Sequence, residues 1–426
     1  MTGAPTVVLA HGVGSRHDLP LSPFYAYAGA FAALFVSFLA LGLLWSASRF
    51  RGATAGHPLP AAVQRCADAP ATRTALRVAG LAAALTVLLH LLLGPDDPDR
   101  NPAPGAVYVL LWVGLVPASL LLGPAWRLLN PLRTLHALLP HPRAPRPLPA
   151  GLGIRPAAAG LLAFAWLELA APAPASTTAL LGLLVVHTTV QFLGAARHGP
   201  DWFARADPFE VYSSLLARLS PLGRRTDGRL VLRSPFHGLD STPRTPGLVA
   251  CVCVLLGSTA YDGLSDNPRW LTTLQTSPLG PSTTATLGLL ATVSLVAALY
   301  GLCAGTLRLM DRTLAHPLSA FAHSLLPIAL GYLVAHYFTL FVTEGPRTVM
   351  MAVGADNALA PDPPLGPGGL ATLQVAAVVT GHVLGVVAAH DRSVRLFPPA
   401  RAVAGQLPLF ALMIVYTLGG IGLLVA

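Results

Sequence analysis

Long apolar runs recur along the chain, each about 20 residues in length and separated by polar stretches. An α-helix needs this length to cross the hydrocarbon core of a bilayer. The runs do not alternate in polarity, as the strands of a membrane β-barrel would. The pattern therefore predicts ten transmembrane helices, at 22–45, 75–94, 104–123, 156–172, 176–195, 247–264, 283–307, 316–342, 370–390 and 405–426.

Two of these runs fit the pattern less well than the others. The run at 156–172 is short and ends in Ala171-Pro172-Ala173-Pro174, which we interpret as a tight turn between two spans. The run at 247–264 carries Asp262 close to its end.

The composition agrees with a membrane protein. The chain is 54% hydrophobic and only 11% charged, whereas an average soluble domain carries roughly 25% charged residues. We therefore expect an all-α bundle of transmembrane helices that forms one integral domain, 1–426, in the plasma membrane, with the lipid bilayer as its main partner.

The basic residues predict the orientation of the helices. All 27 are arginines, and 23 of them fall in alternate loops, including the large Arg-rich loop at 196–246. Arginine and lysine accumulate in the cytoplasmic loops of membrane proteins. The distribution places the external segment 1–21 and the C-terminus outside the cell. The net charge of +9 is explained by orientation and by anionic lipid, so no nucleic-acid partner is expected.

Two of the inner loops contain a similar motif. Asn130-Pro131 and Asp207-Pro208 each precede a short stretch with helical spacing of apolar residues. Asn and Asp are good N-caps, and Pro is favoured in the first turn of a helix. We expect two short amphipathic helices that lie on the cytoplasmic leaflet.

Ionisable residues within membrane spans are costly and are candidates for function. One set is expected near the outer face and mixes imidazoles with carboxylates. It comprises His11, His17, Asp18, His90, Glu168, Asp262 and His336. Such ligands suit zinc, copper or iron, and a bound metal can generate a hydroxide nucleophile. Within this set, His11, His17, His90, His336 and Asp262 are the candidate metal ligands, and Asp262 and His336 the candidate catalytic residues.

A second set lies near the middle of the membrane. His187 and His382 are candidate cofactor ligands there, either as axial ligands of a heme or as part of a proton path. The alternative for every one of these histidines is a structural hydrogen bond inside the bundle.

Several segments resemble those of a known family. The chain is similar to actinobacterial membrane proteins labelled fenitrothion hydrolase, in segments that include His11-Gly12-Val13-Gly14, Asn130-Pro131-Leu132-Arg133, Asp207-Pro208-Phe209-Glu210, Tyr261-Asp262-Gly263, Ala335-His336-Tyr337 and Gly381-His382-Val383. The resemblance covers nearly the whole chain and implies hydrolysis of an organophosphate ester. It supplies no mapped active site.

Three hypotheses about function remain open at this stage. The chain is a metal-dependent hydrolase at the outer face, a secondary transporter whose ten helices divide into five and five, or a heme or redox subunit. The small-molecule substrate, and any homo-oligomer or partner membrane subunit, are not indicated by the sequence.

Overall fold

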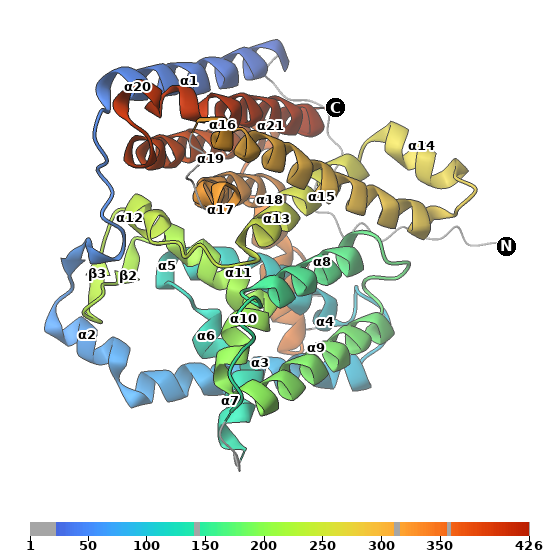
Figure 1. Cartoon of the computed structure of the whole chain (residues 1–426). Coiled ribbons are helices and arrows are strands. Elements are labelled where there is room, and N and C mark those ends of the chain that lie inside the picture. Colours follow the sequence, from blue (N-terminus) through green and yellow to red (C-terminus); the bar gives the residue numbers. More distant parts are fainter. Residues whose placement is uncertain (1–22, 140–144, 311–315, 356–358, 426) are drawn as a thin grey trace.

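A computed structural model describes residues 23–139, 145–310, 316–355 and 359–425 (Figure 1). Within this part of the chain, nine helices are long and apolar enough to cross a membrane. They occupy nine of the ten predicted spans and confirm the all-α polytopic fold. These helices are α1 (Pro23–Leu44), α3 (Pro70–Leu93), the run of α4 (Pro102–Gly105), η2 (Ala106–Val113) and α5 (Leu115–Leu122), α9 (Thr177–His198), α13 (Leu248–Ser265), α15 (Pro281–Gly305), α18 (Leu326–Ala352), α19 (Pro367–Leu396) and α21 (Leu407–Val425).

The tenth predicted span coincides with α8 (Arg155–Leu169), a helix of 15 residues. At 1.5 Å per residue it is about 22 Å long, shorter than the hydrocarbon core of about 30 Å. It starts beside the start of α13, where the backbone N–H of Ile154 donates to the carbonyl of Pro246 at 2.7 Å. The Ala/Pro run that follows is a turn between α8 and α9, as the sequence predicts.

The remaining elements are short and lie mostly in the loops. The helical ones are η1 (Gly52–Thr54), α2 (Ala61–Asp68), η3 (Pro200–Trp202), η4 (Ala217–Leu219), α12 (Pro235–Asp240), α14 (Pro268–Thr276), α16 (Leu307–Met310), α17 (Pro317–Ala320), η5 (Ala322–Leu325), α20 (Pro399–Ala402) and η6 (Ala404–Gln406). Three short strands, β1 (His57–Pro58), β2 (Leu222–Arg224) and β3 (Leu230–Leu232), form an antiparallel sheet in the order β1-β3-β2. The sheet joins two Arg-rich loops that are far apart in sequence.

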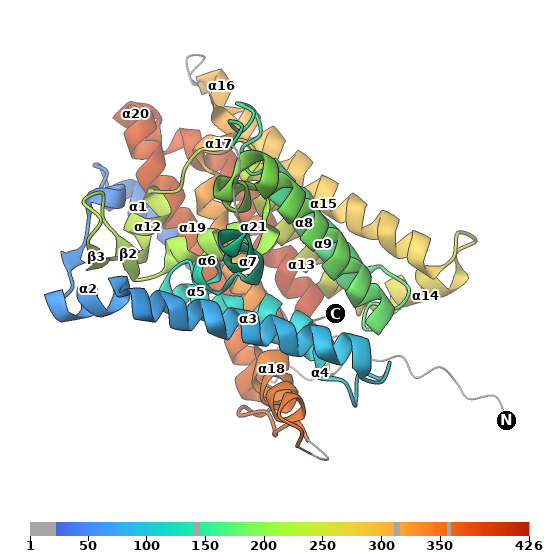
Figure 2. The ribbon, with the colours of Figure 1, turned by 90° about the horizontal axis from the view of Figure 1, so that it is seen from below.

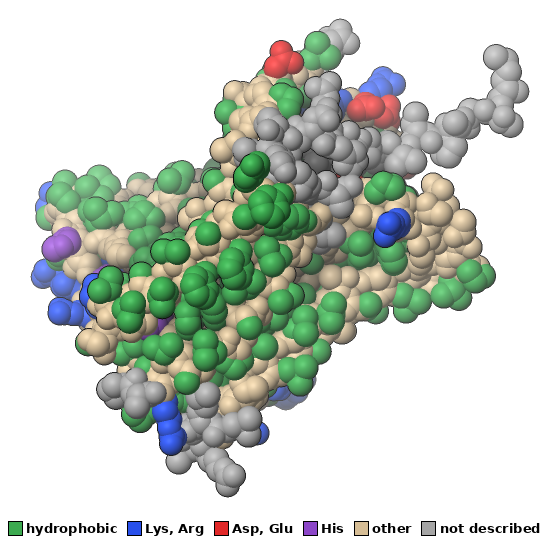
Figure 3. Space-filling view, turned by 90° about the horizontal axis from the view of Figure 1, so that it is seen from above, with side chains coloured by type: hydrophobic (Ala, Val, Ile, Leu, Met, Phe, Trp, Pro, Cys, Tyr) green, Lys and Arg blue, Asp and Glu red, His purple; other side chains and the backbone are tan. Residues whose placement is uncertain are grey.

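The bundle has a buried centre and an apolar surface. In the most apolar stretch of α13 72% of the residues are buried, against 11% in α3. Side chains such as Leu43 and Leu93 are 75% and 82% exposed. Hydrophobic side chains also cover much of the face shown in Figure 3, where charged side chains lie mainly toward the edges. Because water would not tolerate so large an apolar surface, these faces contact lipid, and the protein is a multi-pass membrane protein.

The two ends of the described chain lie side by side. Helix α1 packs against α19 and α21, and the three form one edge of the bundle in Figure 1. Figure 2 shows α3 crossing a different face. The first five helices therefore do not form a separate half from the last five.

Short helices also begin at the two predicted Asx-Pro motifs. Helix α6 (Trp126–Leu129) leads through Asn130 into α7 (Pro131–Leu138), and α10 (Phe203–Ala206) leads through Asp207 into α11 (Pro208–Leu216). Asn130 and Asp207 each accept two backbone N–H groups from the helix that follows. Both predicted helices and both predicted caps are confirmed.

The position of α11 corrects the expectation of a surface helix. Eight of its nine residues are buried, including Glu210 and Ser213. The helix packs against α5, α8 and α10, so it enters the bundle instead of lying on the leaflet. By contrast α7 keeps an exposed apolar side, with Leu135 and Leu138 at its surface.

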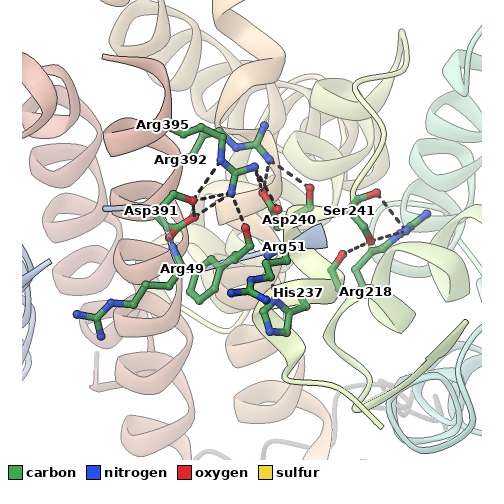
Figure 4. A network of polar contacts seen from close by, with 12 residues as sticks. Arg49, Arg51, Arg218, His237, Asp240, Ser241, Asp391, Arg392 and Arg395 are labelled. Atoms are coloured by element: carbon green, nitrogen blue, oxygen red, sulfur yellow. Dashed lines mark hydrogen bonds and ion pairs between the residues drawn. The ribbon is translucent and has the colours of Figure 1, made fainter. Parts of the chain in front are cut away.

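A polar network holds the Arg-rich ends of the helices together (Figure 4). Asp240 of α12 accepts hydrogen bonds from Arg392 at 3.1 Å and from Arg395 at 2.9 Å, both on α19. Asp391 accepts from the Ser48 hydroxyl at 2.8 Å and from the Arg49 backbone N–H at 2.6 Å. This network fixes α19 against the loop that follows α1.

Candidate functional site

The candidate metal ligands are only partly described. His11 and His17 lie outside the described residues. His90, near the end of α3, uses Nδ1 to contact the carbonyl of Thr86 in the preceding turn at 2.8 Å, which is the structural role typical of a helical histidine. His336 is buried on α18.

The described residues do not form a metal centre. No group of three His, Cys, Asp or Glu side chains with the geometry to hold a metal ion occurs among them. The described part of the predicted outer set therefore does not fit a metal ion by itself. The five-ligand site as a whole stays a prediction, because two of its histidines are not described.

His187 and His382 have separate surroundings. His187 Nε2 lies 3.8 Å from an Asp207 carboxylate oxygen, on a helix, α9, that packs against α3, α7 and α10. His382 belongs to α19, which packs against α1, α18 and α21. Because these helices lie in different parts of the bundle (Figure 1), the two histidines do not form an axial pair in this structure.

His382 itself is fully buried. Its Nδ1 hydrogen-bonds the carbonyl of Val378 at 2.9 Å, and its ring meets Tyr332 edge-on at 5.7 Å between centroids. Its Nε2 has no hydrogen-bond partner among the described residues. The first contact lies within α19, and the ring contact with Tyr332 places His382 between α18 and α19.

Asp262, in contrast, is brought together with another predicted residue. Glu168 stands near the end of α8 and Asp262 near the end of α13, and both are buried, with 7% and 5% of their surface exposed. The two carboxyl groups are close enough to interact electrostatically. They meet because α8 and α13 start together at Ile154 and Pro246 and run in the same direction.

Aromatic side chains surround this pair. The Tyr337 hydroxyl, from α18, donates a hydrogen bond to the Asp262 carboxyl. Tyr108, from η2, and Tyr212, from α11, both interact electrostatically with Glu168. The pair therefore lies where α8, α11, α13, α18 and η2 meet, and we name Glu168 and Asp262 the carboxyl pair.

Two hydrogen-bond donors beside the carboxyl pair are left without a full hydrogen bond. The rings of Trp112 and Tyr212 stack with their centroids 4.5 Å apart. Both groups are buried. The Tyr212 hydroxyl has no hydrogen-bond partner among the described residues, whereas the Trp112 Nε1–H lies beside the Tyr337 hydroxyl without the geometry of a full hydrogen bond. An unsatisfied buried donor costs about 1–3 kcal/mol. A buried donor of this kind calls for an explanation, such as a catalytic role or a bound water or ion.

The helix that carries Tyr108 and Trp112 is irregular. η2 is a π-helical segment of eight residues, and the Gly114 N–H reaches back to the carbonyl of Val109 at 2.9 Å. π-Helical segments within α-helices occur frequently at functional sites. Tyr108 and Trp112 both belong to this segment, and the Tyr108 hydroxyl donates to the carbonyl of Pro174 at 2.8 Å.

A second polar cluster lies at the start of α11, toward the Arg-rich side. The Asn130 amide donates to Asp207 at 2.8 Å, and Arg133 makes two hydrogen bonds to Glu210, at 3.1 and 2.7 Å. Burial raises the pKa of Glu210, although the hydrogen bonds and charge of Arg133 oppose that shift. We name Asn130, Arg133, Asp207 and Glu210 the Asx-Pro junction.

Some contacts of the site could not be found from the sequence. Tyr337 follows His336 in a segment of the family resemblance, but only the fold shows that the phenol contacts Asp262. Tyr212 fitted the apolar face of a helix, and Trp112 fitted an apolar span. The one signal was the presence of polar aromatic residues in apolar helices, which is common and weak.

The chain was compared with protein families, curated proteins and solved structures. No family model, no curated protein and no solved structure matches the chain.

Proposed function

We propose that the protein is a proton-coupled transporter of the plasma membrane, and that the carboxyl pair is its proton-binding site. The observation that carries this proposal is the burial of Glu168 beside Asp262 at the meeting point of five helical elements. Ionised carboxylates are expensive to bury, and two neighbours cannot both ionise cheaply. Such a pair binds and releases a proton, as intramembrane carboxylates do in pumps and transporters.

The surroundings of the pair support a small ligand. The described residues around it are Tyr108, Tyr212, Tyr337 and Trp112, so aromatic rings fill the space beside the carboxyl groups. A proton can bind to the carboxyl groups without any change in this arrangement. The transported small molecule would bind in a state in which the helices around the pair have separated.

The experiment uses the proton itself as the probe. The protein is reconstituted into liposomes on a solid-supported membrane, and a pH jump is applied while the transient current is recorded. We expect wild type to move charge, and Glu168→Gln and Asp262→Asn to lose most of it. Glu344→Gln is the matched control, since Glu344 pairs with Arg347 elsewhere on the protein. Equal currents from wild type and both carboxyl variants would overturn the proposal.

A membrane-embedded hydrolase is the second candidate, and one observation favours it. The Tyr212 hydroxyl, which has no hydrogen-bond partner among the described residues, interacts electrostatically with Glu168 and would suit the oxygen of a phosphoester, as in an oxyanion hole. The two carboxyl groups would then act as general acid and general base. The metal-dependent form of this candidate, with His11, His17, His90, His336 and Asp262 as ligands, stays a prediction, because His11 and His17 lie outside the described residues.

The hydrolase candidate has its own test. Purified protein is assayed on aryl phosphotriesters, with and without added zinc, copper or iron, and its bound metals are measured by elemental analysis. Activity that falls about 100-fold in Tyr212→Phe, the loss typical of one missing oxyanion donor, would favour the hydrolase. No hydrolysis under any of these conditions would exclude these substrates.

A further inference from the structure

A hollow opens in the protein surface where α8 and α13 begin, on the Arg-rich side. Its volume is about 330 Å³. Three separate parts of the chain form its walls: the turn at 148–153, Arg205 of α10, and the segment 245–246 just before α13. Sites for small molecules have volumes of roughly 300–1,000 Å³, so the hollow suits a small group. We name it the Arg205 hollow.

The backbone around the Arg205 hollow is firmly held. The Ile154 N–H donates to the carbonyl of Pro246 at 2.7 Å, which joins the turn to the segment before α13. Gly153 lies so close to this segment that a Cβ there would overlap the Pro246 carbonyl. The third wall is fixed because α10 packs against α8. The hollow is therefore part of the packed fold.

One wall of the hollow is cationic. The side chain of Arg205 is half-exposed and makes no hydrogen bond or ion pair with any described residue. Arg224 of the same loop, by contrast, pairs with Asp68. None of the described residues that line the hollow is acidic. Because a guanidinium can give two parallel hydrogen bonds to phosphate oxygens, an anion can bind Arg205 without displacing another group.

The other walls are mostly apolar, with Leu148, Pro149, Leu152 and Pro246 among their side chains. A free inorganic anion would leave this apolar surface exposed to water, whereas the glycerol and first acyl carbons of a phospholipid would cover it. Pro246 also lies only two residues before the start of α13, a helix long enough to span the membrane. The hollow is therefore at the level where lipid headgroups lie.

We propose that the Arg205 hollow binds the headgroup of an anionic phospholipid. The phosphate accepts hydrogen bonds from the Arg205 guanidinium, and the glycerol lies against the leucine and proline side chains. Basic pockets beside transmembrane helices bind anionic headgroups at the cytoplasmic face, which is where the arginines predict this side of the protein to be. This inference does not depend on the proposed proton site.

The test measures binding of a short-chain anionic phospholipid, dihexanoyl phosphatidylglycerol, to the full-length protein in detergent by microscale thermophoresis. We expect saturable binding to wild type. Arg205→Gln should weaken it by about tenfold or more, the effect of losing one hydrogen bond between charged groups. Arg197→Gln is the matched control, because it removes the same charge from an exposed residue at the end of α9, outside the hollow. It should bind as wild type does.

A second variant tests the hollow without changing any charge. Ala150 is an exposed residue of the lining turn, so Ala150→Trp can fill the hollow without disturbing the core. We expect the same loss of phosphatidylglycerol binding. This variant also tests the proposal if Arg205→Gln fails to fold.

Each other outcome would overturn the proposal. Equal affinities in Arg205→Gln and Arg197→Gln would show that the lipid responds only to overall charge. Undiminished binding to Ala150→Trp would place the lipid outside the hollow. Inorganic phosphate that binds as tightly as phosphatidylglycerol would assign the hollow to free phosphate, and dihexanoyl phosphatidylcholine that binds as tightly would show that the net negative charge is not recognised.

Discussion

Asp207 connects two parts of the chain that lie 77 residues apart. One of its oxygens caps α11, and the other accepts the amide of Asn130, which itself caps α7. Because all of these groups are buried, no water replaces a lost contact. The residue is therefore expected to be essential for the position of α11.

Asp207→Ala should destabilise the detergent-solubilised protein by about 2–4 kcal/mol. The loss of an N-cap costs about 1 kcal/mol, and each buried donor left unpaired costs about 1–3 kcal/mol. The unfolding midpoint measures the effect. Asp201→Ala, at an exposed residue of η3, is the control and should match wild type; equal midpoints for the two variants would show that the junction is dispensable.

His237 provides a pH-dependent contact at the Arg-rich side. Its Nδ1 accepts the backbone N–H of Arg51 at 3.1 Å. Burial, together with the charges of Arg233 and Arg51, lowers its pKa, against the opposing charge of Asp240. A lowered histidine pKa means that the unfolded state binds more protons, so the contribution of His237 is complete above pH of about 6.5. It is lost as the pH falls through the lower folded pKa.

Hydrogen exchange measures this loss directly. The protection factor of the Arg51 amide, which is its exchange rate relative to that of an unstructured amide at the same pH, should be high at pH 7 and should fall as the pH drops below about 6. His237→Gln should remove most of the pH dependence at this amide. An Arg51 amide that responds equally to pH in both proteins would contradict the assignment.

At the residue scale, the sequence predicts local geometry better than contacts. Asn130 and Asp207 were correctly predicted as caps, since a cap depends on its own neighbours in the chain. Their mutual hydrogen bond could not be predicted, because it depends on how distant helices pack. The same reason explains why Asp262 was a candidate from the start while its contact with Tyr337 was not.

At the scale of the element, small residues set how closely α18 and α19 approach. A Cβ on Gly331 would lie 2.5 Å from the Ala377 carbonyl, and one on Gly381 would lie 2.5 Å from the Pro327 carbonyl. Close packing at small residues is the usual basis of helix association in membranes. The pair carries Tyr337 on one helix and His382 on the other.

Gly381→Leu should force these helices apart. Overpacking of this kind costs about 1–3 kcal/mol or more, and the unfolding midpoint should fall accordingly. Gly369→Leu is the control on the same helix, because a Cβ there would meet only the flexible Leu365 side chain, at 3.5 Å. Two variants of equal stability would exclude the close approach.

The hydrophobic pattern of the sequence predicts the long helices but not the position of every short helix. Apolar length predicted the long helices well, since it is set by the bilayer. The burial of α11 was not predicted, because a short stretch with Glu210, Ser213 and spaced apolar residues has the composition of an interfacial helix. Only the packing of α5, α8 and α10 around it distinguishes the two cases.

At the scale of the whole molecule, the orientation is still a prediction from the arginines. Cys66 is exposed and lies in a loop predicted to face the cytoplasm. A membrane-impermeant maleimide should label it only in inverted vesicles. Asp362→Cys in a Cys66→Ser background places a thiol at an exposed position of an outer loop and should be labelled only in intact cells. The reverse labelling would invert the topology.

Proton-coupled transport by this protein depends on whether the carboxyl pair holds a proton in the membrane interior. Infrared difference spectra of the reconstituted protein across a pH series measure this directly. The chain has three glutamates, Glu168, Glu210 and Glu344, so the band of one can be assigned by substitution. We predict a protonated-carboxyl band at neutral pH that is lost in Glu168→Gln, shifted in Asp262→Asn and unchanged in Glu344→Gln. A spectrum that Glu168→Gln and Asp262→Asn both leave unchanged at every pH would show that the pair binds no proton and would contradict the proposed proton site.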